Sequence, residues 1–215
     1  MAGLNDQTHQ GIAVALQGVS HTFKGRTVFD PVSAHLSVGG ECLIRGANGS
    51  GKSTLGRIIA GELTPTLGNV RWSSSDDELD AEVLCTLSQR VSPVSSLHPQ
   101  LTIAELIAFQ GQFRPWAVPK AAEDLLNKAG LSNHMHKAYH DLSSGMQQRV
   151  KLTLALASQT GLIVLDEPCA NLDASGVKWY REAIQEIRGN TTLVVCSNDR
   201  KEDFIDPDLI IELAG

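Results

Sequence analysis

Gly46-Ala47-Asn48-Gly49-Ser50-Gly51-Lys52-Ser53-Thr54 matches the pattern G-x-x-x-x-G-K-[ST], in which nearly every fixed residue has a mechanical role in binding phosphate. The glycines let backbone N–H groups approach phosphate oxygens closely, and the positive end of a helix dipole adds to the charge of Lys52. Residues 41–45 ahead of the loop are typical of a short strand, and residues 55–60 continue as a helix that Gly61 can cap. This order of strand, loop and helix predicts a nucleoside triphosphate site in which Ser53 brings its hydroxyl to a magnesium ion.

The composition indicates one globular domain without a broadly basic surface. The chain has 215 residues, of which 42% are hydrophobic, a formal net charge of −6 and a pI near 5.6. This apolar content is sufficient for a buried core, whereas the negative charge argues against a nucleic-acid partner. No apolar run approaches the roughly 20 residues that span a bilayer, and no basic stretch precedes an apolar one at the N-terminus, so we expect a cytosolic protein.

The cysteines and histidines do not predict a metal site or a disulfide framework. Cys42, Cys85, Cys169 and Cys196 are widely separated and show no C-x-x-C spacing, so we expect reduced thiols packed in or near strands. A cluster at residues 134, 136 and 140 contains three histidines that could bind metal. Only one carboxylate accompanies these histidines, and a solvated loop explains the segment better.

Two kinds of β pattern flank the phosphate loop and predict an α/β fold. Residues 12–16, 19–23 and 35–38 mix alternating apolar residues with glycine-containing turns, which favours an antiparallel β region. Residues 83–87, 162–165, 193–196 and 209–213 are short apolar runs separated by helical patterns, as expected for buried parallel strands. The acidic, serine-rich segment 73–82 is expected to be a solvated loop. Together these patterns predict a P-loop core built on a mainly parallel sheet.

A mostly helical stretch between about residues 90 and 160 predicts a subdomain inserted into this core. Thr102 and Glu105 form a capping-box pattern, residues 119–130 can form a second helix, and Ser143 can cap a third. Ser175 can begin a later helix that Gly189 ends. We therefore expect a single domain over residues 1–215, with a core of about 1–90 and 160–215 and a helical subdomain of about 91–159.

Residues 162–167 form an apolar strand pattern that ends in two carboxylates, where an α/β sheet exposes ligand-binding groups. With the phosphate loop upstream, Asp166 is the expected magnesium partner. Glu167 is placed to polarise a water for in-line attack on the γ-phosphate.

Leu142-Ser143-Ser144-Gly145-Met146-Gln147-Gln148-Arg149 resembles the Leu-Ser-Gly-Gly-Gln signature of the ATP-binding cassette family, and the resemblance covers essentially the whole chain. It implies an ATP-binding and ATP-hydrolysing transporter subunit with ATP and Mg²⁺ as cofactors. In the family, the signature meets the γ-phosphate held by a second subunit in a head-to-tail dimer. Ser143 and the amides around Gly145 at a helix N-terminus suit such an anion site, although an ordinary serine-capped helix is the alternative.

The resemblance also implies roles for residues outside these motifs. Phe23 is similar in position to the aromatic residue that stacks on adenine, although it could belong to the core instead. Gln89, expected directly after a strand over residues 83–88, resembles the glutamine that reaches the metal or attacking water and links the site to the membrane partner. Asp173 resembles part of the loop that communicates between subunits, although it could simply cap the next helix. The implied ATP-binding residues are Phe23, Gly46, Asn48, Gly49, Ser50, Gly51, Lys52, Ser53, Thr54, Ser143 and Gly145; the catalytic residues are Glu167, Gln89 and Asn198; and the metal ligands are Ser53, Gln89 and Asp166.

Two departures from the family pattern bear on hydrolysis. Ser144 and Met146 stand where the signature usually has glycine and glutamine. Asn198 stands in the place of the family's switch histidine, and an amide is shorter than an imidazole and cannot become positive. Since Glu167 and the metal site remain, we expect hydrolysis to be slow rather than lost.

The function implied is to power substrate translocation through separate transmembrane subunits. The chain would pair with a second ATP-binding subunit, identical or different, and lie peripherally on the inner face of the cell membrane. Its compactness and signature resemble those of small exporter subunits. A soluble ABC-type clamp or regulatory module is the alternative, although such proteins resemble tandem or coiled-coil-interrupted chains. A P-loop kinase would leave residues 142–149 unexplained.

Overall fold

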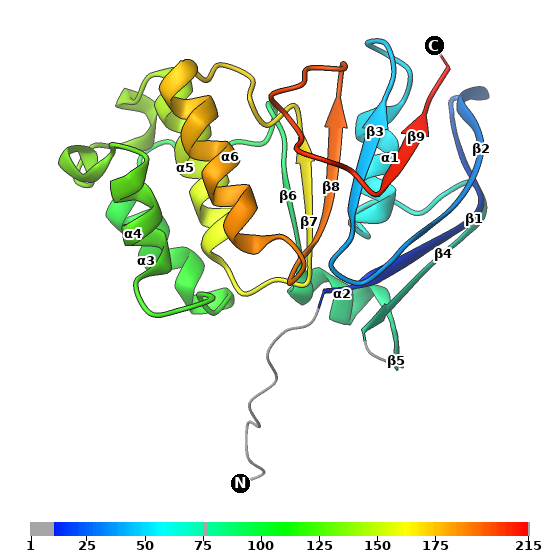
Figure 1. The fold of residues 1–215 in the computed structure, drawn as a ribbon, viewed down its shortest axis with the longest axis horizontal. Coiled ribbons are helices and arrows are strands. Elements are labelled where there is room, and N and C mark those ends of the chain that lie inside the picture. Colours follow the sequence, from blue (N-terminus) through cyan, green and yellow to red (C-terminus); the bar gives the residue numbers. More distant parts are fainter. Residues whose placement is uncertain (1–10, 75–76, 215) are drawn as a thin grey trace, which may run out of the picture.

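Two β-sheets enclose the helix that follows the phosphate loop. The computed structural model describes residues 11–74 and 77–214. A five-stranded parallel sheet has the order β6-β7-β8-β3-β9, and a four-stranded antiparallel sheet has the order β2-β1-β4-β5 (Figure 1). Helix α1 (Lys52–Ile59) contributes Leu55 and Ile58 to a buried cluster that also contains Val14 of β1 and Val164 of β7, so it packs between the sheets. The predicted fold class, a P-loop α/β core with an antiparallel β region, is confirmed.

The parallel sheet aligns the carboxyl ends of its central strands. It consists of β3 (Glu41–Arg45), β6 (Ser88–Val91), β7 (Leu162–Asp166), β8 (Thr192–Ser197) and β9 (Leu209–Glu212). Every residue of β7 and β8 is buried, as expected for strands that are covered on both faces. Asp166 pairs with Cys196, which in turn pairs with Ile44. The segments that follow β3, β7 and β8 therefore emerge at one edge of the sheet.

The antiparallel sheet differs from its prediction in where its strands begin and end. Its strands are β1 (Ala13–Phe23), β2 (Arg26–Leu36), β4 (Leu67–Ser74) and β5 (Asp77–Leu79). Residues 12–16 and 19–23 were expected as two strands, but β1 is continuous and absorbs Gly18 as an irregularity in its pairing. The segment 73–82, expected to be a loop, contributes to two strands and the start of a helix.

Helix α2 (Ala81–Leu87) replaces the strand predicted over residues 83–87. Asp80 caps it by accepting a hydrogen bond from Val83 N at 2.8 Å, and Leu84 is its one buried residue. A short apolar run fits helix and strand equally well, so the cap decides the outcome. The parallel strand is the next four residues, β6, which places Gln89 inside a strand rather than after one. Cys85 is correspondingly exposed on the helix, unlike the other three cysteines, and all four are free thiols.

Helices α3 to α6 lie together on one side of the parallel sheet (Figure 1). They are α3 (Ile103–Phe113), α4 (Ala121–Lys128), α5 (Ser144–Ala157) and α6 (Ala174–Ile187), and two 3-10 turns, Ser132–His134 and Tyr139–Asp141, precede α5. The predicted capping box at Thr102 and Glu105 and the predicted cap at Ser143 are confirmed. The predicted cap at Ser175 is wrong: Asp173 caps α6 by accepting from Gly176 N at 2.8 Å. No helix among the described residues is both long and apolar enough to cross a bilayer.

Candidate nucleotide site

The phosphate loop joins β3 to α1 in a conformation that requires glycine at its first position. A Cβ on Gly46 would lie 2.5 Å from Leu213 O and 2.6 Å from Ser50 Oγ. Gly51, at the N-cap of α1, has a φ of 97°. Lys52 is buried, and its Nζ donates to Gly46 O at 2.7 Å and to Ala47 O at 2.9 Å. The loop is therefore folded around the lysine, with the N-terminus of α1 directly behind it.

Two carboxylates lie at the carboxyl end of β7, at the same sheet edge. Asp166 is 6% exposed and ends the strand, while Glu167 is the next residue. Glu167 has a φ of 46°, unusual for a residue with a side chain, and its N donates to Cys196 O at 2.9 Å. Such a conformation persists only where the surrounding structure compensates the strain, and residues of this kind cluster at functional sites.

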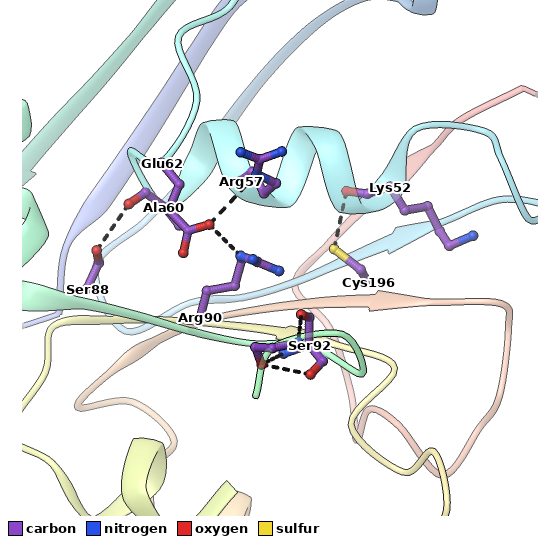
Figure 2. A network of polar contacts seen from close by, with 9 residues as sticks. Lys52, Arg57, Ala60, Glu62, Ser88, Arg90, Ser92 and Cys196 are labelled. Carbon is purple, nitrogen blue, oxygen red and sulfur yellow. Dashed lines mark hydrogen bonds and ion pairs between the residues drawn. The ribbon is translucent and has the colours of Figure 1, made fainter. Parts of the chain in front are cut away.

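Asn198, which follows β8, bridges the other two loops. Its Nδ2 donates to Asn48 Oδ1 of the phosphate loop at 2.5 Å and to Glu167 Oε1 at 3.0 Å. Two residues before Asn198, the thiol of Cys196 in β8 points at the carbonyl of Lys52, with Sγ and O 3.5 Å apart (Figure 2). A cavity of about 450 Å³ beside the phosphate loop is lined in part by Asn48 and Asn198. The structure thus brings the predicted residues Asn48, Lys52, Glu167 and Asn198 to one place.

The signature segment contacts the chain that follows Glu167. Ser143 caps α5 by accepting from Met146 N at 3.3 Å, and Ser143 and Ser144 are exposed. A Cβ on Gly145 would lie 2.7 Å from Asn171 O, so only glycine permits this approach. Gln148 Nε2 donates to Pro168 O at 2.9 Å. Among the described residues no hydrogen bond joins 143–149 to the phosphate loop of the same chain, so the two predicted ATP-binding segments remain apart in one subunit.

Asp173 of the same segment is tied to the signature helix as well as capping α6. It accepts from Arg149 Nη2 at 2.5 Å, while Arg149 Nη1 donates to Ala129 O at 2.7 Å. The hydrogen bond from Gly176 N, with that from Ser175, lowers the pKa of the Asp173 carboxyl. Asp173 therefore does cap α6, as the alternative interpretation predicted. Its contact with Arg149 also links this cap to the signature helix α5.

Phe23 lies at the end of β1 with 64% of its surface exposed. The alternative that it belongs to the core is therefore wrong. The exposed ring is free to stack on adenine, and this role of Phe23 stays a prediction.

The structure does not bring Gln89 to this group. Gln89 pairs with Ile163, three residues before Asp166 along the neighbouring strand, which corresponds to about 10 Å along the sheet. It lines a cavity of about 390 Å³ together with Glu62, Arg90 and Arg114, and its Nε2 is buried without a hydrogen-bond partner in the described residues. Glu62 lies between Arg90, at 2.8 Å, and Arg57, at 3.9 Å, in this wall (Figure 2).

Three buried charged residues were not predicted: Glu41, Lys151 and Asp203. Lys151 of α5 donates from Nζ to Ser92 O at 3.0 Å and to Ser95 O at 3.3 Å, and burial lowers its pKa. Asp203, after β8, is fully buried and accepts two hydrogen bonds. For Lys151, its place within an otherwise apolar helical run was a weak sign of burial. No sequence pattern distinguishes Asp203 from surface carboxylates.

Residues 29–170 match the family model described as ABC transporter, and this segment spans the phosphate loop, the signature and both carboxylates. The chain belongs to the ABC transporter family. The resemblance inferred from the sequence is therefore confirmed, and the family's ATP-hydrolysing cassette accounts for the clustered loops.

Several ABC transporter relatives are similar to this chain over most of its length. It is 32% identical to the Fe(3+) ions import ATP-binding protein FbpC 2 of Pectobacterium atrosepticum, over 91% of this chain and 58% of that protein. It is 32% identical to the cytochrome c biogenesis ATP-binding export protein CcmA of Paramagnetospirillum magneticum, over 80% and 81% of the two chains. It is 31% identical to the ergothioneine transport ATP-binding protein EgtV of Helicobacter pylori, over 88% and 91%. The chain thus spans little more than half of some relatives and most of others.

Solved ABC structures share the fold. A dimeric bacterial ABC transporter cassette superposes with a TM-score of 0.79 at 26% identity, over 94% of each chain. An ATP-bound bacterial Atm1-family ABC exporter gives a TM-score of 0.80 at 20% identity, covering 94% of this chain and 37% of that one.

Proposed function

We propose that this chain binds Mg²⁺ and ATP and hydrolyses ATP as one half of a dimer that drives transport through separate transmembrane subunits. The observation that carries the proposal is the position of Asn198, whose amide contacts both Asn48 of the phosphate loop and the Glu167 carboxylate. These three residues come from three loops at the carboxyl edge of a parallel sheet, where ligands bind in open α/β folds.

The residues present fit a magnesium ion. Ser53 in the first turn of α1 and Asp166 at the end of β7 supply the hydroxyl and carboxylate oxygens that Mg²⁺ prefers. Ser50 Oγ, inside the loop, is buried with no hydrogen-bond partner in the described residues, as expected where a bound group completes the site. When bound, Mg²⁺ neutralises charge on the phosphate oxygens.

The chain's own residues then have distinct roles. Lys52, the glycine-rich loop and the N-terminus of α1 bind the phosphates of ATP. Glu167 orients the attacking water and accepts its proton, and its carboxylate lies within hydrogen-bond distance of Asn198. When ATP binds, Asn198 exchanges one of its two acceptors, Asn48 Oδ1 or Glu167 Oε1, for the γ-phosphate. Phe23 stacks on adenine.

A second ATP-binding subunit completes the site. Ser143, Gly145 and the first amides of α5 form an exposed, positively polarised helix terminus that is not joined to the phosphate loop of its own chain in the described residues. This supports contact with the γ-phosphate on another subunit. The superposition with a dimeric cassette is consistent with that arrangement.

The transmembrane subunit docks over the cavity that contains Gln89. One side of this cavity is formed by the end of α1 and by β6, and the other side by α3 and α5. Its lining carries three basic side chains, Arg90, Arg114 and Lys151, and one carboxylate, that of Glu62. A docked partner would place the chain peripherally on the inner face of the membrane. Relatives named for import and for export are equally similar, so the direction follows from the partner.

Copurification with transmembrane proteins tests the transport proposal against a soluble clamp or regulatory module. We expect a transmembrane protein to copurify with the tagged chain from detergent-solubilised membranes, and Arg114→Glu to reduce its recovery strongly. Arg71→Glu, on the exposed side of β4, is the matched control and should not change recovery. Recovery of ribosomes or DNA in place of a membrane protein would support the clamp.

A further inference from the structure

A buried carboxylate connects the two loops that carry Glu167 and Asn198. Asp203 is 0% exposed, its Oδ1 accepts from Cys169 N at 3.0 Å, and its Oδ2 accepts from Ser197 Oγ at 2.6 Å. Cys169 lies two residues after Glu167, and Ser197 lies one residue before Asn198. One side chain thus fixes both segments next to the predicted reacting groups.

The groups around Asp203 favour a carboxylate over an amide at this position. A backbone N–H can only donate, so Cys169 N needs an acceptor. Ser197 Oγ already accepts from Arg200 N at 3.2 Å, which leaves its own hydrogen to point at Asp203. A carboxylate accepts at both oxygens, whereas an amide of the same shape has only one acceptor. Its NH₂ group would either face Cys169 N or reverse the bond to Ser197, whose hydroxyl hydrogen would then need another acceptor.

Neighbouring bonds hold Asp203 itself in place. Tyr180 of α6 donates its hydroxyl to Asp203 O at 2.7 Å, and the Cys169 thiol donates to Glu202 O at 3.3 Å. Arg181 Nη1 donates to the carbonyls of Lys201 and Phe204, each at 3.0 Å. The turn after β8 is therefore fixed to α6 and to the loop after β7 at several points.

We infer that Asp203 is a positioning residue for ATP hydrolysis, which holds the Glu167 and Asn198 loops at the separation their contact requires. This inference rests on the proposed function. Burying a carboxylate among neutral donors costs desolvation free energy, which an apolar residue would avoid. The 3.0 Å contact between Asn198 Nδ2 and Glu167 Oε1 depends on two flexible side chains, and Glu167 has a strained backbone. A fixed link beneath both loops maintains this geometry.

The kinetic test uses Asp203→Asn, with Ser197→Ala as a second variant that removes only one of the two bonds. We expect kcat to fall about tenfold or more in Asp203→Asn, while KM for ATP changes less than about twofold, because misplaced catalytic groups affect the chemical step. In an Asn198→Ala background the same substitution should have little further effect. Asp208→Asn is the control, since Asp208 also accepts a backbone bond, from Glu41 N at 2.8 Å, but at the opposite end of the sheet. Equal losses of kcat in Asp203→Asn and Asp208→Asn, or effects that simply multiply with Asn198→Ala, would overturn the inference.

Hydrogen exchange tests the link without requiring activity. In Asp203→Ala, which removes both acceptors, we expect faster exchange at the amides of Cys169 and Arg200, with protection of the amides in β3 and α5 unchanged. Unchanged exchange at Cys169 and Arg200 would overturn the inference even if the protein hydrolyses ATP. Absence of hydrolysis by the unsubstituted protein would instead contradict the proposed function.

Discussion

The side-chain amide of Asn198 donates to Glu167 Oε1 at 3.0 Å, so the residue after β8 contacts the carboxylate after β7 directly. The same nitrogen contacts Asn48 Oδ1, which ties the pair to the phosphate loop. The amide itself does not titrate, but it adds no positive charge opposite a phosphate. The arrangement therefore supports orientation of the reacting groups more strongly than charge stabilisation.

Substitution of Asn198 should change the rate of hydrolysis more than the affinity for ATP. We expect Asn198→Ala to lower kcat by about tenfold to a hundredfold, because a donor to the transition state is lost. Asn198→His should raise kcat, because imidazole reaches further and can become positive. Steady-state ATPase assays measure both. Asn190→His, in the exposed turn before β8, is the control. A large drop in Asn198→His would show that asparagine is the adapted residue.

Gly145→Ala should uncouple ATP binding from hydrolysis. The added Cβ would lie 2.7 Å from Asn171 O, a backbone atom, so the first turn of α5 or the 168–173 segment must shift. We expect kcat to fall at least about tenfold while one subunit binds ATP with unchanged affinity, since no hydrogen bond joins this turn to the phosphate loop in the described residues. Fluorescent-nucleotide titration and ATPase rates separate the two effects. Ser144→Ala, at the adjacent exposed position, should leave both near the unsubstituted values.

The four cysteines should differ sharply in thiol reactivity. Burial raises the pKa of Cys42 to about 12 and also raises those of Cys169 and Cys196, whereas Cys85 is exposed. Because the thiolate is the reactive form, a thiol reagent at pH 8 should label one cysteine quickly and three only after unfolding. Cys85→Ser should abolish the fast phase, and a fast phase that persists would contradict the assignment.

The raised pKa of Cys42 contributes stability that is complete below the unfolded value of 9.0 and is lost as pH rises from there toward 12.

The sequence predicted the parts of this protein that local chemistry specifies. The phosphate loop, the two carboxylates at the end of β7 and the serine cap of α5 each depend on residues adjacent in the chain. The structure contains the expected loop, strand end and cap. The strand predicted over residues 83–87 was wrong because Asp80 caps a helix there, and an apolar run of this length is ambiguous.

Contacts between distant segments could not be predicted. Asp203 and Ser197 are six residues apart, but the carboxylate has its role through Cys169, which is 34 residues away. The position of Gln89 depended on where β6 begins and ends, and the strand that forms leaves it about 10 Å from the level of Asp166 along the sheet. Register and burial decided these cases, and neither follows from residue type alone.

The most direct test of the account is the oligomeric state of Glu167→Gln with Mg²⁺ and ATP, measured by size-exclusion chromatography with light scattering. The substitution keeps the shape of the side chain but removes the group that accepts the proton of water, so ATP should remain bound between two subunits. We predict a dimer with ATP and a monomer without nucleotide, and loss of the dimer on adding Gly145→Ala. A Glu167→Gln protein that binds ATP yet remains monomeric at every concentration would contradict the composite site.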